Sequence, residues 1–136
     1  MSKRWQDSVV QYHGGVNNDD RVEGLNRFQG RRPIIDPETH QRTGWESILE
    51  EEQARFSVGQ QHSGGIGLTY TAASYAIYFS NDYSLEARKQ SEDRIHRIGQ
   101  KHKCTYIDLV AEDTLDEKVL AALKQKELLA HEIIDA

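Results

Sequence analysis

This sequence has little cysteine, no long apolar run and no phosphate-binding loop. Its single cysteine, Cys104, excludes an internal disulfide framework and favours a reducing compartment. No stretch approaches the roughly 18 consecutive apolar residues of a membrane span, and the first residues lack the apolar core of a signal peptide. No Gly-x-x-x-x-Gly-Lys-Ser/Thr loop is present, and no Asp-Glu-x-His box follows a strand-like run. These absences predict a cytoplasmic location, no membrane partner and no self-contained ATP site.

The composition is that of a soluble globular protein. The 136 residues suit one domain, with 37% hydrophobic and 29% charged residues. A formal net charge of −5 argues against a protein that coats DNA through overall positive charge. Residues 86–103, however, hold six basic and three acidic residues. Any anion site is therefore expected in this stretch.

Strand-like and helical patterns alternate along the chain. Apolar, β-branched or aromatic runs predict four strands, at 8–13, 54–58, 75–79 and 105–110. The nearly continuous apolar run at 75–79 predicts a strand buried on both faces. Helical spacing and capping residues predict helices after Asn18-Asp19-Asp20, after Ser84 and after Thr114. The alternation favours an α/β fold with a mainly parallel sheet of about four strands.

Each predicted helix has its own limits. The first is expected to run to Phe28 and stop at Gly30, and the second to end at Gly99. The last carries an apolar stripe of Leu115, Val119, Leu120, Leu123, Leu128 and Leu129. Residues 31–44 are predicted to be a loop, because two prolines and a glycine interrupt any period, and 46–53 a short surface helix. Residues 31–53 together form a loop or insertion.

Two stretches carry candidate chemistry. Gly64, Gly65 and Gly67 precede Thr69, and residues without a side chain let the backbone approach a phosphate closely; a bare turn explains them equally well. Arg94 and Arg97 lie three apart, so on a helix they would project from nearly the same face and form a fork for phosphate oxygens. A solvated face paired with acidic neighbours explains most isolated Arg-x-x-Arg pairs. The complete string from Gln90 to Gln100 is what favours function here.

These stretches resemble two helicase motifs. Residues 64–73 resemble motif V of superfamily-two helicases, and residues 90–100 resemble motif VI in the version of the Swi/Snf-type branch, which ends in Arg-Ile-Gly-Gln. Residues 12–15 and 113–119 resemble flanking segments of the same lobe, in the right order. The likeness covers about residues 8–130, with a gap over 30–53. The motif VI match is highly specific for these helicases, whereas the motif V match is specific only when motif VI accompanies it.

The resemblance implies the second of two RecA-like lobes. Residues 1–136 would form one three-layer C-terminal lobe that lacks its usual first strand. By motif position, Arg94 and Arg97 would be catalytic arginine fingers. The resemblance also implies nucleotide-proximal residues, namely Gln90, Gly65 and Gly67, and nucleic-acid-proximal residues, namely Ser63, Gly64 and Thr69.

The resemblance further implies what the lobe works with. ATP and Mg²⁺ would be bound only in the full two-lobe enzyme, with an N-terminal lobe supplied by the same parent chain or by another. DNA would be bound without sequence preference, and the isolated chain would be inactive. The family's Trp-Asn-Pro reads Tyr83-Ser84-Leu85 here, which predicts a divergent, phage-derived member in a bacterial or phage-infected cytoplasm. A eukaryotic source would instead predict the nucleus.

Alternatives to a motor lobe are a non-catalytic DNA- or protein-interaction module and an unrelated nucleotide-binding α/β enzyme. The first has no need of both arginines, and the second lacks a phosphate loop. The six histidines show no ligand spacing, so no metal site is predicted. Trp45 is expected to pack against the lobe in preference to stacking on a base.

Overall fold

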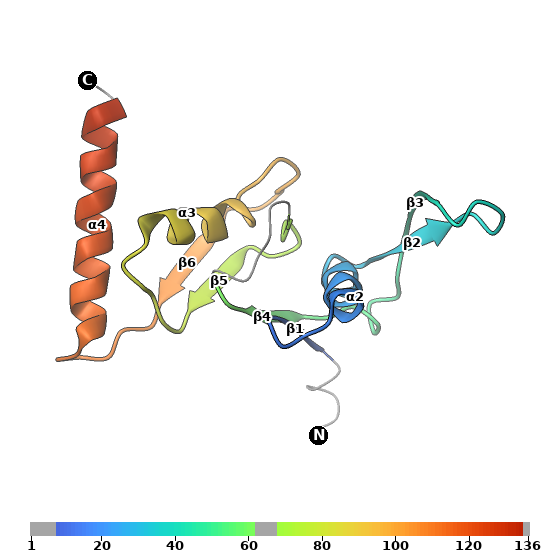
Figure 1. Cartoon of the computed structure of the whole chain (residues 1–136), viewed down its shortest axis with the longest axis horizontal. Coiled ribbons are helices and arrows are strands. Elements are labelled where there is room, and N and C mark those ends of the chain that lie inside the picture. Colours follow the sequence, from blue (N-terminus) through green and yellow to red (C-terminus); the bar gives the residue numbers. More distant parts are fainter. Residues whose placement is uncertain (1–7, 62–67, 135–136) are drawn as a thin grey trace. The chain divides into compact units, whose positions relative to one another are not determined.

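The computed structural model describes residues 8–61 and 68–134, which Figure 1 shows in colour. The chain forms two compact units, Met1–Ala72 and Ala73–Ala136. Within the described residues, no helix is both long and apolar enough to span a membrane.

The first unit is built on a parallel strand pair and one helix. Strand β1 (Val9–Tyr12) pairs with β4 (Phe56–Gly59), and α2 (Asn18–Phe28) follows β1. Asn17 caps α2, since its Oδ1 accepts the Asp20 N–H at 2.8 Å. Gly30 takes a φ of +68° just past the helix, as the predicted stop requires. Among the described residues of this unit, the buried hydrophobic ones are Val10, Phe28 and Ala54.

Residues 31–47 form a β-hairpin, so the prediction of a loop over 31–44 and of a helix over 46–53 was wrong. Strand β2 (Arg31–Ile35) pairs antiparallel with β3 (Arg42–Ser47). Both strands are edges of a two-stranded sheet, and an edge strand tolerates proline, which has no N–H to donate. The turn is held by Asp36, whose Oδ1 accepts N–H groups of Glu38 and Thr39 at 2.8 and 2.7 Å.

The hairpin segment leaves and rejoins the first unit at one place, the end of α2. The Ile48 N–H donates to the Gly30 carbonyl at 3.2 Å. The Gln53 amide donates to the Phe28 carbonyl at 3.3 Å. The hairpin therefore extends from the end of the helix, and its strands pair with each other and not with β1 or β4.

The second unit repeats the same construction with different elements. Strand β5 (Tyr75–Tyr78) pairs in parallel with β6 (Thr105–Asp108). Helix α3 (Leu85–Asp93) lies along this pair, and α4 (Leu115–Ile134) ends the described chain (Figure 1). The buried hydrophobic residues are Tyr78, Ala87, Ile95, Val119 and Leu123.

The predicted α/β class with parallel strands is confirmed. All four predicted strands form, and each pairs in parallel with another of the four. Among the described residues the pairing occurs as two separate two-stranded ladders, with the hairpin as a third.

One burial prediction was wrong. Strand β5 is not buried on both faces, because Tyr75 and Ile77 are 66% and 64% exposed while Tyr78 is buried. The reason is that β5 belongs to a two-stranded ladder with helix α3 along it, so alternate side chains face outward. The apolar stripe of α4 is buried only at Val119 and Leu123, whereas Leu115, Leu128 and Leu129 are exposed.

Candidate functional site

The arginine-bearing segment begins on helix α3. Ser84 caps this helix as predicted, with its Oγ accepting the Ala87 N–H at 3.2 Å. The helix ends at Asp93, with Arg94 as its C-cap, and does not continue to Gly99 as predicted. Residues 94–99 form an irregular turn, in which the Gln100 N–H donates to the Arg97 carbonyl at 2.9 Å.

The Gln100 side chain holds the turn that follows the helix. Its Nε2 donates to the Ile95 carbonyl at 3.2 Å and to the Ala73 carbonyl at 2.6 Å, while its Oε1 accepts the His102 N–H at 2.9 Å. The Ile95 carbonyl is also the acceptor of the Arg97 N–H, at 3.1 Å. Local backbone bonds and this one amide thus hold the turn, in place of another helical turn.

The prediction that Arg94 and Arg97 share a helix face was wrong, since only the C-cap position of Arg94 touches the helix. Arg94 is half-buried and Arg97 is exposed, on either side of Ile95, which is 9% exposed. Gly99, with a φ of +102°, reverses the chain just after Arg97. The two guanidiniums are therefore presented by a pinned turn and not by a regular helix.

Gln90 stands one turn before the arginines. It is exposed, and its Nε2 donates to the Glu86 Oε1 at 3.0 Å. Gln90, Arg94 and Arg97 thus lie on one short segment of the second unit.

A buried ion-pair network holds α3 against the strands, and sequence reasoning missed it. The Arg88 guanidinium donates to both carboxylate oxygens of Asp108, to the Asn81 Oδ1 at 3.0 Å and to the Glu92 Oε1 at 2.6 Å. It also lies 3.6 Å from the centre of the Tyr78 ring. The opposite charges of Arg88, in the predicted helix, and Asp108, in the predicted strand at 105–110, were the available signal.

The network changes the acidity of its carboxylate. Burial raises the pKa of Asp108, but the hydrogen bonds from Arg88 and Asn81 outweigh burial, so the pKa lies below its usual value of 3.8. Asp108 is therefore ionised at neutral pH, and Arg88 remains its counter-ion.

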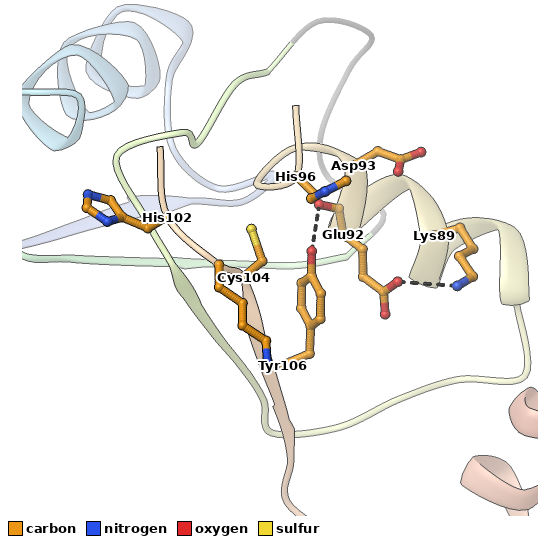
Figure 2. A pocket seen from close by; sticks show the side chains of 8 residues that line it. Lys89, Glu92, Asp93, His96, His102, Cys104 and Tyr106 are labelled. Atoms are coloured by element: carbon orange, nitrogen blue, oxygen red, sulfur yellow. Dashed lines mark hydrogen bonds and ion pairs between the residues drawn. The ribbon is translucent and has the colours of Figure 1, made fainter. Parts of the chain in front are cut away.

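A shallow cavity of about 440 Å³ opens beside the end of α3 (Figure 2). Its lining mixes both charges with Cys104 and Tyr106 and contains neither candidate arginine. Burial, together with the neighbouring Cys104, raises the pKa of the Tyr106 hydroxyl to about 12. The Tyr106 hydroxyl faces the Glu92 carbonyl, with 3.4 Å between the two oxygens. No group of three metal-ligating side chains occurs among residues 8–61 and 68–134.

The motif V stretch is only partly described. Ser63, Gly64, Gly65 and Gly67 lie outside the described residues. Thr69, in the first unit, is half-buried, and its carbonyl accepts a hydrogen bond from the Gln29 amide. The Gln29 Oε1 accepts the Ala72 N–H at 3.2 Å, so one side chain fixes both ends of residues 69–72.

Comparison with known proteins finds relatives named as chromatin-remodeling ATPases and as helicases. No protein-family model matches the chain. It is 37% identical over 107 residues to the chromatin-remodeling ATPase INO80 of Candida albicans, covering 79% of this chain and 7% of that protein. It is 36% identical over 114 residues to helicase swr-1 of Neurospora crassa, covering 84% and 6%. Helicase domino of Drosophila melanogaster is 26% identical over 129 residues, covering 95% and 4%.

A solved structure supports the fold. The crystal structure of the C-terminal part of the Fun30 ATPase domain matches with a TM-score of 0.63 and 19% identity, covering 87% of this chain and 31% of that one. The chain spans less than a tenth of the length of the three relatives named above. It is nevertheless aligned with them over most of its own length, and the Gln90–Gln100 string lies in its second unit. The chain is therefore a homologue of the Swi/Snf-type superfamily-two helicases, with the fold of the C-terminal, RecA-like lobe of their ATPase region.

Proposed function

We propose that this chain is the C-terminal motor lobe of a DNA-dependent ATPase and that Arg97 and Arg94 act as arginine fingers. The observation that carries the proposal is the turn at 94–99, which is pinned by Gln100 and leaves Arg97 exposed. The homology to helicases over most of the chain supports the same assignment.

A pinned turn suits this chemistry. An arginine finger stabilises the negative charge that develops on the transferring phosphoryl group, and fixed charges act best because they need no rearrangement during the reaction. Gln100 fixes the turn through two backbone carbonyls, one of them preceding β5. The guanidinium keeps its charge at any relevant pH.

The rest of the site belongs to a second lobe in this proposal. An N-terminal lobe, in the same parent chain or another, would bind ATP and Mg²⁺, and Gln90, Gly65 and Gly67 would lie near the nucleotide. Ser63, Gly64 and Thr69 would lie near a DNA backbone, bound without sequence preference. If the source is eukaryotic, the proposal includes a nuclear location, since the chain is similar to a protein named as a chromatin-remodeling ATPase. A phage source stays a prediction, as does the choice between helicase and translocase activity.

The test is ATP hydrolysis by the two-lobe enzyme with and without DNA. Arg97→Ala is expected to lower kcat by about 10³-fold or more, the range for arginine fingers. Lys101→Ala removes an exposed charge from the same stretch and is expected to leave kcat unchanged. The isolated chain is expected to show no activity. Full activity in Arg97→Ala would refute the assignment, and DNA binding with no nucleotide effect in any two-lobe context would favour an interaction module.

A further inference from the structure

The charged side chains of the β2–β3 hairpin lie on two different faces. In the strand register Arg32 is opposite Glu46, and Pro33 is opposite Trp45. Because side chains alternate along a strand, Arg32 and Glu46 share one face, while Arg31, Pro33 and Trp45 share the other. On the first face the Arg32 Nε donates to the Glu46 Oε1 at 2.6 Å, which neutralises that face.

The second face carries two arginines over one aromatic ring. The guanidinium carbon of Arg31 lies 4.0 Å from the centre of the Trp45 ring, and that of Arg42 lies 4.5 Å away. Trp45 is 37% exposed and Arg42 is exposed. Stacking holds a planar guanidinium by its face and leaves its N–H edge directed outward.

These two arginines have no acidic partner among residues 8–61 and 68–134. No ion pair forms at Arg31 or Arg42, and the buried Nε of Arg31 has no hydrogen-bond acceptor within that part of the chain. Three nearby acids are engaged elsewhere: Asp36 with the turn, Glu46 with Arg32 and Glu52 with the Leu49 N–H. Two guanidiniums with available donors suit phosphate oxygens.

We propose that the face of Arg31, Arg42 and Trp45 binds the DNA phosphate backbone. The inference rests on the proposed DNA-dependent function and adds to it a surface outside both helicase motifs. Residues 31–53 contain three arginines and six acidic residues, so overall charge does not draw DNA to this segment. The interaction is local and is made by guanidiniums that Trp45 already orients. It does not distinguish one DNA sequence from another.

The test is binding of the 136-residue chain to a mixed-sequence DNA duplex, followed by fluorescence anisotropy at several salt concentrations. The Arg31→Gln/Arg42→Gln variant is expected to bind about tenfold more weakly at low salt. The slope of log K against log salt should become shallower by about 0.9 for each phosphate that the variant no longer neutralises. Arg32→Gln, on the opposite face of the same hairpin, is the matched control and should bind as the parent does.

A second readout reports on the site itself. In a Trp5→Phe background Trp45 is the only tryptophan, and its emission should change when duplex is added. Unchanged affinity and slope in the double variant, with Trp45 emission indifferent to DNA, would overturn the proposal and favour a protein as the occupant. Absence of any DNA binding by the parent chain would also overturn it. Loss of ATPase activity in Arg97→Ala tests the proposed function separately, so the two can fail independently.

Discussion

The Arg88 guanidinium donates to both carboxylate oxygens of Asp108 while lying over the Tyr78 ring, 3.6 Å from its centre. This interaction joins α3 to both strands of the second unit, and α3 leads directly into the arginine turn. The stability of the network therefore bears on the position of the candidate site.

Removal of one member of this pair should destabilise the protein strongly. Arg88→Met leaves Asp108 charged and half-buried without its counter-ion, and we expect a loss of about 2–4 kcal/mol in the free energy of unfolding. Lys89→Met breaks the more exposed pair with Glu127 and should cost under about 1 kcal/mol. Urea denaturation measures both. If the exchanged pair Arg88→Asp/Asp108→Arg is no more stable than the sum of its single changes predicts, the two charges do not act as a pair.

The Arg88–Asp108 pair also makes the free energy of unfolding depend on pH. The pKa of Asp108 is lower when folded than its usual 3.8, so its contribution is complete above that value and is lost as the pH falls below it towards the folded pKa. Urea midpoints measured between about pH 5 and pH 2 should decline less steeply in Asp108→Asn than in the parent. Glu112→Gln, an exposed change of equal charge, is the control. Parallel declines in all three proteins would contradict the assignment.

The Gln100 amide should be hard to replace even by its closest analogue. Gln100→Glu removes the two bonds that Nε2 donates to the Ala73 and Ile95 carbonyls and sets a carboxylate oxygen against them, which should destabilise the fold by about 1–3 kcal/mol. In the two-lobe enzyme kcat should fall more than KM changes, because the turn that carries Arg97 shifts. Gln41→Glu, at the exposed hairpin turn, is the matched control. Equal kcat values for the two variants would show that Gln100 does not position the arginine.

Gly99 offers a test of backbone conformation alone. A Cβ at Gly99 would meet nothing within 4 Å, but its φ of +102° is strained for any residue with a side chain. Gly99→Ala should cost about 1–2 kcal/mol in thermal or urea unfolding. Gly14→Ala is the control, since Gly14 also has open space but no positive φ. Similar losses of stability in Gly99→Ala and Gly14→Ala would show that the positive φ of Gly99 is not the cause.

The sequence patterns predicted those features of the fold that depend on short-range chemistry. The strands at β1, β4, β5 and β6 and the caps at Ser84 and Gly30 follow from alternation, hydroxyl caps and glycine stops. The hairpin was not predicted because the rule that proline breaks a strand fails at a sheet edge. The turn that replaces the last part of the predicted helix was missed because it is held by a bond from Gln100 to Ala73, 27 residues earlier, and no local pattern encodes such a partner.

The candidate site, like the fold, was predicted where short-range patterns determine it and missed where distant residues do. The string from Gln90 to Gln100 identified the segment, but spacing alone placed Arg94 and Arg97 on a helix face that does not exist. Arg88 and Asp108 are 20 residues apart, and only the packing of α3 on β6 brings them together. The roles of both arginines at a phosphate stay predictions until the two-lobe enzyme is assayed.

The hairpin segment departs at Gly30 and returns at Gln53, where both ends are tied to the same turn of α2. Its exchange for a link of about two or three residues would leave the β1–β4 register undisturbed and would shorten the loop that folding must close. The hairpin segment is thus replaceable as a unit, and evolution can lengthen or remove it. It is equally a place where a designer could graft a new recognition element.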